Sequence, residues 1–580
     1  MLIKRPARSP ILSTGINGGD GFLIFTHAQV GNSIVLVGAV GFCVEDDSPL
    51  APFFRGRPVD EDAGNETTLN RAAAWVQNCL NRHKHCDSNE NAPLPSRLLD
   101  LDCSLGLDHV KLWEAGGHYG RYATLSYCWG QSEHFTTTCA SIEARKRGIT
   151  FKELPKTFQD AIIIARRLSI RYLWIDSLCI CQDDPKDWEE ESAKMTAIYS
   201  NSHLTIAATA AKDNAVGCFT CRPERRHIPI DLVAEHGTSG RLVAFRLPLA
   251  EATLSRRYLV MRDEPLSRRA WALQERVMSQ RLLHYSTDQM YYECNEEFLT
   301  EDGVRVQGRY NGQFSGPEAG FMTIDLSSRH SKEHALWYHL LMEYTSRRLT
   351  KATDKLPALS GLARMFAARI KGVYLAGLWS NALIESLAWQ SLGSYDDDPP
   401  AISPVYIAPS WSWASYNGIA ATSAENCTDV ATILDYHISL ESGDPFGKIT
   451  DGWIRVRGPL IPLSLSGVPE DEEFPGRRHM RLKTPWGNPF GAYARFENIS
   501  LHDEAREARV LRLMPLFALM LLQIDKDDDD NITYVSLIIG ADGIGNSAMK
   551  RLGFILMDTE ILGNRKAVKD SDNFATVKLV

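Results

Sequence analysis

The stretch from Tyr122 to Ala210 constrains the fold most, because short unbroken apolar runs alternate there with helical patterns. The runs predicted to be strands are Tyr122–Cys128, Tyr172–Ile175 and Leu204–Ala208. Between them, apolar residues recur at helical spacing, first after Leu154 and then from about Asp187 to Tyr199. Alternating strands and helices predict a parallel sheet with right-handed crossovers, whose strands are apolar throughout because both faces are covered. We therefore expect an α/β domain.

Polar and aromatic residues gather where two of these strands end. The first strand ends on Tyr127 and Cys128, and Trp129 and Gly130 follow it. The second is followed by Asp176, Ser177, Cys179 and Gln182. Ligands of parallel sheets bind beyond the carboxyl ends of the strands, so these residues form the expected site.

Composition excludes several classes of protein. Apolar residues make up 44% and charged residues 23% of the 580 residues, as in ordinary folded proteins and unlike disordered or collagen-like chains. The net charge of −9 disfavours a nucleic-acid partner. Twelve cysteines are too few for a disulfide scaffold. No apolar signal segment opens the chain, and the run Ile34–Val44 is shorter than the ~20 residues that span a membrane. We expect a cytoplasmic protein with no membrane partner.

Changes of pattern along the chain predict five segments. We expect an N-terminal extension (1–94) that completes the core or stands apart, the α/β domain (95–295), a glycine-rich linker or insertion (296–330), a helical region (331–420) and a β-rich C-terminal region (421–580). The helices expected in the helical region cover 334–344, 356–368 and 375–389. The strands expected in the last region include 453–456, 514–522, 534–539 and 554–557.

Several short motifs occur in a fixed order. Those of the α/β segment are Tyr122–Gly130 (YATLSYCWG), Leu154–Asp160 (LPKTFQD), Trp174–Asp183 (WIDSLCICQD), Met195–Tyr199 (MTAIY), Trp271–Arg276 (WALQER) and Arg281–His284 (RLLH). Together they resemble the motifs of fungal heterokaryon-incompatibility (HET) domains. Beyond them, Asp354–Gly361, Ala376–Trp379 and Ala408–Ala414 are similar to the C-terminal half of many such proteins. The resemblance covers about residues 95–420.

The resemblance implies a function in fungal non-self recognition (heterokaryon incompatibility) and regulated, programmed cell death. Its implied partners are an allelic or non-allelic incompatibility protein, or a second copy of the chain. HET domains have been likened to TIR domains, some of which cleave NAD, and the implied fold is therefore TIR- or flavodoxin-like. This leaves an alternative function as an enzyme, either an NAD or nucleotide glycohydrolase or a secondary-metabolism enzyme with a cysteine nucleophile. Whether the chain is an enzyme stays open here.

Two carboxylates are the first candidates for catalysis. Glu275 lies at the expected start of a helix and could act as a general acid or base, or stabilise an oxocarbenium-like centre. The alternative is an ion pair with Arg276 or Arg269. Asp176, directly after a buried strand, is either a ligand-facing group or a cap for the next turn. Gln182, Gln274 and Arg276 are the candidate positioning groups for substrate binding.

Thiols and aromatic residues supply the remaining candidates. Cys128 and Cys179 could be nucleophiles if a base such as His284 or His203 lay nearby, but buried cysteines are commonly inert apolar residues. Trp129 could stack on a nucleobase, although tryptophans at such spacings are more often core residues. Tyr127, Gly130 and Ser177 complete the candidate substrate-binding set.

Two groups of possible metal ligands deserve comparison with known sites. One group is Cys179, Cys181, Cys218 and Cys221, and the other is Cys79, His83, His85 and Cys86. Zinc sites usually have a Cys-x(2–4)-Cys pair at each end, and only Cys218 and Cys221 form such a pair. We therefore predict no metal site and no cofactor.

Overall fold

The computed structural model divides the chain into two compact units, Met1–Thr323 and Ile324–Val580. The residues that the structure describes are 11–14, 23–30, 33–54, 56–86, 89–102, 106, 108–131, 134–233, 237–247, 261, 263–303, 330–392, 405–422, 427–467, 480–486, 490–492, 495–496, 515–524, 532–541, 547–562, 568 and 571–580. Most of the linker expected at 296–330 lies outside these residues. Among the described residues, no helix combines the length and the apolar character needed to cross a bilayer.

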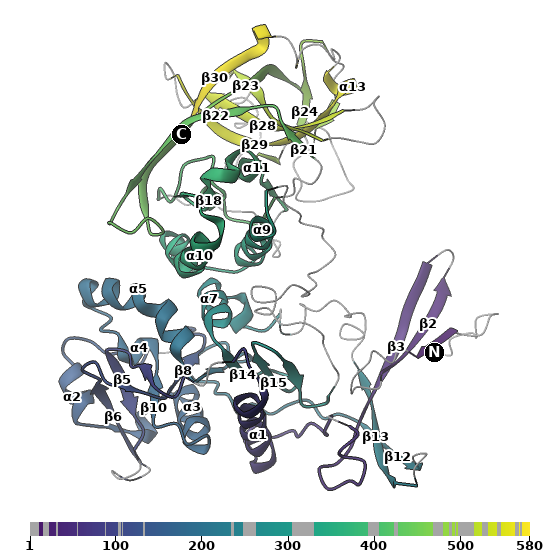
Figure 1. Cartoon of the computed structure of the whole chain (residues 1–580), viewed down its shortest axis with the longest axis vertical. Helices are drawn as coiled ribbons and strands as arrows, with labels where there is room; N and C mark the ends of the chain where they lie inside the picture. The colour runs from purple at the N-terminus through teal and green to yellow at the C-terminus, as the bar shows by residue number, and fades with distance from the viewer. Residues whose placement is uncertain are drawn as a thin grey trace. The chain divides into compact units, whose positions relative to one another are not determined.

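A nine-stranded mixed sheet forms the centre of the first unit (Figure 1). Its strands are Arg97–Asp100 (β5), His109–Glu114 (β6), Tyr122–Ser126 (β8), Ile149–Thr150 (β9), Tyr172–Trp174 (β10), Leu204–Ala207 (β11), Arg281–Tyr285 (β14), Met290–Cys294 (β15) and Phe298–Thr300 (β16). They lie in the order β16-β15-β14-β11-β8-β10-β5-β6-β9. The strands β8, β10 and β11 are parallel, as the sequence predicts, and β14 extends them as a fourth parallel strand.

The expectation of a purely parallel sheet is wrong at both edges. Strands β15 and β16 pair antiparallel on one side, and β5, β6 and β9 pair antiparallel on the other. Antiparallel strands need only short connections, so they can extend a parallel core without further crossover helices. The α/β class is confirmed, and the sheet is mixed.

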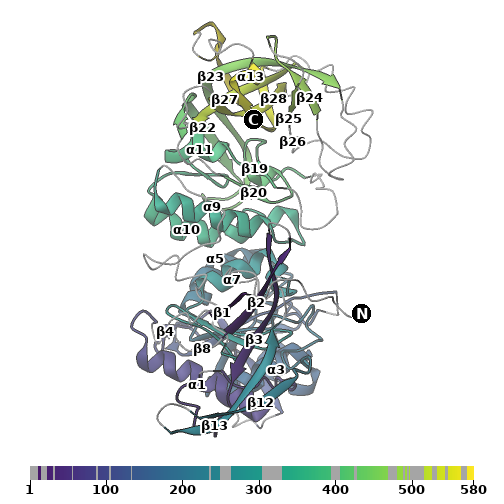
Figure 2. The ribbon, with the colours of Figure 1, turned by 90° about the vertical axis from the view of Figure 1, so that its right-hand side faces the viewer.

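Helices cover both faces of the parallel core. They are Glu66–Arg82 (α1), Lys156–Arg167 (α3), Asp176–Cys179 (α4), Pro185–Asn201 (α5) and Ala270–Met278 (α7). Figures 1 and 2 show α5 and α7 on one face of the sheet and α1 and α3 on the other. The crossover through α3 leads from β8 to β10, whereas the crossover through α5 returns past β8 to β11. Because both crossovers follow the same right-handed rule, this reversal puts their helices on opposite faces.

Local sequence explains these elements. All five residues of β8 are buried, as its unbroken apolar run predicts. Helix α5 begins where the Asp184 side chain accepts hydrogen bonds from the backbone of Lys186 and Asp187, with Pro185 as its first residue. Helix α3 begins just after Pro155, close to the expected start.

Residues before the α/β core also belong to the first unit. The Asn65 side chain caps α1 by accepting from the Thr68 N–H, and α1 packs against α3 and β15. A separate antiparallel sheet joins early and later segments in the order β1-β2-β3-β13-β12. These strands are Ile11–Thr14 (β1), Leu23–Val30 (β2), Ser33–Cys43 (β3), His227–Val233 (β12) and Ser239–Leu247 (β13).

The second unit opens with helices. Two of the three expected helices are confirmed as Lys332–Thr345 (α9) and Pro357–Ile370 (α10). The third expectation, 375–389, is wrong in its first part. A hairpin of Tyr374–Leu375 (β17) and Leu378–Trp379 (β18) precedes a short helix, Leu383–Leu387 (α11). The hairpin turns at Gly377, whose φ is +98°, and a Cβ there would lie 2.3 Å from the Trp413 indole nitrogen.

A closed sheet follows in the same unit. Its main strands are Ile449–Gly467 (β23), Leu516–Ile524 (β27), Thr533–Ala541 (β28), Ala548–Asp558 (β29) and Phe574–Leu579 (β30). The 19-residue β23 pairs with β30 and also with β27, which closes the ring through β28 and β29. The strands expected at 453–456, 534–539 and 554–557 fall within β23, β28 and β29, and the strand expected at 514–522 overlaps β27. The described part of this region consists mainly of strands.

Candidate active site at the strand ends

Glu275 brings a buried carboxyl group to the end of β8. It lies on α7 with 5% of its surface exposed, and Ser126 Oγ donates a hydrogen bond to its Oε2. Burial raises the pKa of Glu275 to about 7, although Arg269 and Ser126 partly oppose this shift. A carboxyl group with this pKa can hold or release a proton near neutral pH, as general acid–base catalysis requires.

Asp176 brings a second carboxyl group from the end of β10. Its Oδ2 accepts from Trp129 Nε1 at 2.8 Å, and its Oδ1 accepts from the Ser177 N–H at 2.6 Å. Burial raises its pKa, while Arg269 and these hydrogen bonds lower it. Its side chain stays partly exposed. Asp176 therefore orders the turn and is also partly open to solvent. Its role as a ligand-facing group stays a prediction, as does the alternative role as a cap for the turn.

Arg269 connects the two carboxyl groups electrostatically. It directly precedes α7, and its Nη1 donates to the Tyr127 carbonyl oxygen. Burial alone would lower the pKa of Arg269, but nearby Glu275, Cys128 and Asp176 raise it. The sequence suggested Arg269 only as an ion-pair partner of Glu275. Its place next to Asp176 depends on how α7 packs, which no motif reveals.

Tyr199 is a further neighbour of Glu275 that the sequence analysis missed. Its hydroxyl lies 3.3 Å from the Leu125 carbonyl oxygen, and a hydrogen bond to the Glu275 side chain lowers the pKa of that carboxyl. Burial raises the pKa of Tyr199 well above its ordinary value, so the hydroxyl stays a neutral donor. In the sequence, Tyr199 is indistinguishable from the apolar residues of the α5 face.

The predicted substrate-binding residues at the two strand ends lie together. Tyr127 donates its hydroxyl proton to Ser177 Oγ at 2.9 Å, which links the turn after β8 to the turn after β10. Trp129 makes a second link through Asp176. Gly130 has a φ of +72°, and a Cβ there would lie 2.0 Å from Asp213 Cβ. Only glycine fits this approach to the segment after β11.

The two candidate nucleophiles have properties of buried core residues. Cys128 packs with Ala207, Leu266 and Ala272, and burial raises the pKa of its thiol to about 11. Burial raises the pKa of the Cys179 thiol to about 12. Both thiols are therefore protonated at neutral pH, which disfavours nucleophilic catalysis because the thiolate is the reactive form.

Arg276 and His284 meet in a separate buried cluster. Arg276 Nε lies 2.9 Å from Glu293 Oε2, and His284 Nε2 lies 3.3 Å from the same oxygen. Thr209 Oγ1 lies 3.1 Å from His284 Nδ1. Gln274, on the same helix as Arg276, is 2% exposed. Arg276 thus forms an ion pair with Glu293 on β15, and its role in substrate binding stays a prediction.

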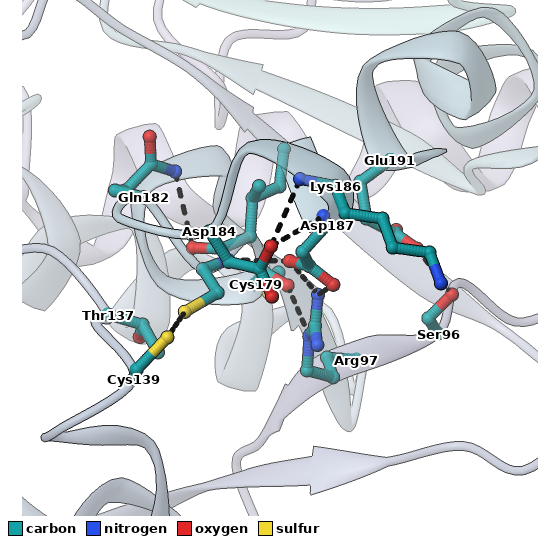
Figure 3. A network of polar contacts seen from close by, with 12 residues as sticks. Ser96, Arg97, Thr137, Cys139, Cys179, Gln182, Asp184, Lys186, Asp187 and Glu191 are labelled. Atoms are coloured by element: carbon teal, nitrogen blue, oxygen red, sulfur yellow. Dashed lines mark hydrogen bonds and ion pairs between the residues drawn. The ribbon is translucent and has the colours of Figure 1, made fainter. Parts of the chain in front are cut away.

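Gln182 takes part in the network that fixes the Asp176 turn (Figure 3). Its Nε2 donates to the carbonyl oxygens of Asp176 at 3.1 Å and Ile180 at 3.2 Å. Arg97 on β5 donates to both carboxylate oxygens of Asp187, at 2.6 and 2.5 Å, and to the Cys179 carbonyl oxygen at 2.6 Å. This network ties the first turn of α5 to the sheet and so holds Asp176 in place.

Fold and site together define an α/β domain with paired carboxyl groups at the carboxyl ends of its parallel strands. Residues 122–275 match the family described as Heterokaryon incompatibility protein (HET). The chain therefore contains a HET domain at residues 122–275, which confirms the resemblance of its motifs in this range. No curated protein and no solved structure matches the chain significantly.

Proposed function

We propose that this protein acts in heterokaryon incompatibility, a form of fungal non-self recognition, and in the cell death that follows it. Family membership supports the general role. We further propose that the HET domain carries the effector activity, by cleaving the N-glycosidic bond of a nucleotide such as NAD. The observation that carries this proposal is the pair Glu275 and Asp176, two carboxyl groups of raised pKa next to Arg269.

The chemistry of glycosidic bonds suits this pair. Such reactions use two carboxyl groups around an oxocarbenium-like transition state. In our proposal, the bond between the sugar C1 and the base nitrogen breaks and the base leaves with the electron pair, while the negative charge of Asp176 stabilises the cationic sugar. Water then bonds to C1, and Glu275 in its ionised form takes the proton that this water loses. Trp129 stacks on the base, and Tyr127, Gly130 and Ser177 shape the walls. Gln182, Gln274 and Arg276 act indirectly by positioning these groups.

The strand order supports a site at this place. The order β10-β8-β11-β14 runs second, first, third, fourth along the chain. This is the order of flavodoxin-like doubly wound sheets, which bind ligands beside the first strand where the order reverses. We propose a fold of this TIR- or flavodoxin-like kind. A cysteine-based enzyme is less well supported, because burial keeps Cys128 and Cys179 protonated.

Expression in a filamentous fungus tests the function. We expect growth arrest and cell death with the wild-type chain, and loss of both with Glu275→Gln and with Asp176→Asn. Glu191→Gln is the matched control, because Glu191 is 2% exposed, like the buried Glu275, and its carboxyl group bonds Ser96 and Lys194 rather than a residue of the proposed site. Death that persists in Glu275→Gln at equal protein levels would contradict the proposed effector activity. It would favour signalling through an incompatibility partner or by self-association.

A further inference from the structure

Four potential metal ligands meet where α1 ends beside β15. Cys79 lies in the last turn of α1, His83 and Cys86 follow that helix, and Cys294 is the last residue of β15. One ligand atom from each residue lies within 4.8 Å of all the others. His83 Nδ1 lies 3.2 Å from Cys294 Sγ and 3.9 Å from Cys86 Sγ.

The spacing of these atoms suits a single tetrahedral ion. With Zn–S bonds of about 2.3 Å and Zn–N bonds of about 2.0 Å, neighbouring ligand atoms lie about 3.5–3.8 Å apart. The observed separations of 3.2 and 3.9 Å lie on either side of that range. Three sulfurs and one imidazole nitrogen form one of the common zinc ligand sets. Cys79 and Cys294 are fully buried and Cys86 is 7% exposed, as expected for a closed, structural site.

Residues around the four ligands support metal binding independently. His83 Nε2 lies 3.5 Å from Glu297 Oε2. A carboxylate at the far nitrogen is the usual way to orient a metal-binding histidine, and it leaves Nδ1 for the metal. Arg281 Nε donates to Cys79 Sγ at 3.3 Å, and the Arg281 side chain is completely buried. Zn²⁺ with three thiolates and one neutral imidazole carries a net charge of −1, which the guanidinium of Arg281 would balance.

We propose that Cys79, His83, Cys86 and Cys294 bind a structural Zn²⁺ ion. The ion would fasten α1 to the edge of the nine-stranded sheet. His83 and Cys294 are 211 residues apart in the sequence, so their common ligation would close a long loop and stabilise the first unit.

The sequence-based prediction covered part of this set and rejected a metal site, because Cys79 and Cys86 do not form a Cys-x(2–4)-Cys pair. It also included His85, whose Nδ1 lies 3.1 Å from Glu296 Oε1 and whose side chain is 81% exposed. Cys294 could not be added from spacing, since only the pairing of β15 with β14 brings it to α1.

Metal analysis of the purified full-length chain tests the proposal. We expect about one zinc per chain in the wild type after growth with added zinc and purification without chelator. Cys294→Ala should lose most of the bound zinc. Cys43→Ala should keep it, and Cys43 is the matched control because it is a fully buried cysteine of the same unit outside the cluster.

X-ray absorption on the wild-type protein gives an answer even if Cys294→Ala does not fold. We expect a zinc shell of three sulfurs at about 2.3 Å and one nitrogen at about 2.0 Å. Wild-type protein without zinc, a Cys294→Ala variant with the wild-type zinc content, or a disulfide between two of the cluster cysteines in freshly prepared protein would each overturn the proposal.

Discussion

Opposing effects hold the Glu275 carboxyl group between its two protonation states near neutral pH. Burial disfavours the anion, whereas Arg269 and the hydroxyl groups of Ser126 and Tyr199 favour it. The nearby charge of Asp176 disfavours it again. A carboxyl group balanced in this way exchanges a proton readily at the pH of the cell.

This balance makes stability depend on pH. The folded pKa of about 7 lies above the ordinary value of 4.5, so the stabilising contribution is full below pH 4.5 and is lost as the pH rises through 7. Glu275→Gln removes this loss. We expect the variant to exceed the wild type at pH 8 by on the order of 3 kcal/mol, and to match it near pH 4.5. Chemical unfolding at both pH values measures the difference, and a variant less stable than wild type at pH 8 would contradict this account.

The sequence predicts some residues of the site and not others, for a physical reason. Asp176 and Trp129 each follow a predicted strand. They lie close together because these two strands are parallel neighbours that end at the same edge of the sheet. Glu275 was recognised through the motif that contains it. Tyr199 reaches Glu275 only because α5 and α7 pack side by side on one face of the sheet, and Arg269 interacts with Asp176 only because of how α7 packs. Packing of this kind depends on side-chain shape along both helices and leaves no local signal.

At the scale of elements, the loops beyond β8 and β11 press against each other at Gly130. Its positive φ and the nearness of Asp213 are two separate reasons for glycine. Gly117 has a similar φ of +82° but no atom within 4 Å of the position that a Cβ would take. A substitution at Gly117 therefore introduces backbone strain without a steric clash.

We expect Gly130→Ala to lower the free energy of unfolding by about 2–5 kcal/mol, through backbone strain and overpacking together. Gly117→Ala should cost only about 1 kcal/mol, from strain alone. Urea unfolding of both variants measures these costs. Equal losses would show that the contact with Asp213 is unimportant.

At the same scale, Asp160 anchors the segment after β11 to α3. It is fully buried, pairs with Lys156, and accepts from the N–H groups of Cys218 at 2.9 Å and Phe219 at 3.1 Å. The motif Leu154–Asp160 therefore has a structural explanation apart from catalysis.

Asp160→Ala would leave these buried donors unpaired, and we expect a loss of about 3–5 kcal/mol. Asp435→Ala removes an exposed ion pair with Arg455 and should change stability little. Thermal unfolding compares the two variants. Similar midpoints for both would contradict the anchoring role.

Sequence patterns predict the elements themselves unevenly. Unbroken apolar runs predict β8, β10 and β11, because a strand that is buried on both faces of the sheet needs no alternating polar residues. In the edge strands β5, β6, β15 and β16, apolar and polar residues alternate less clearly. These strands are recognised from their backbone pairing in the structure and not from their sequence pattern. The positive φ of Gly377 interrupts the helix expected over 375–389. Trp413, which packs against this glycine, lies far away in the sequence, so the local sequence does not reveal the interruption.

At the scale of the whole molecule, the chain consists of two units with their own cores. The proposed zinc site lies wholly in the first unit, so metal removal should affect that unit alone. We expect a chelator to increase amide hydrogen exchange in α1 and β15 by at least about tenfold, and to leave β27 and β28 unchanged. Mass spectrometry of exchanged peptides locates the effect. Equal changes in both units would contradict the local role of the metal.

Incubation of the purified chain with NAD, followed by chromatography for released nicotinamide, tests the central claim most directly. The account predicts release by the wild type and by Glu191→Gln, and a loss of about 100-fold or more in Glu275→Gln. No release by the wild type, in monomeric or self-associated fractions, or equal release by Glu275→Gln, would contradict a glycosidic site at the strand ends.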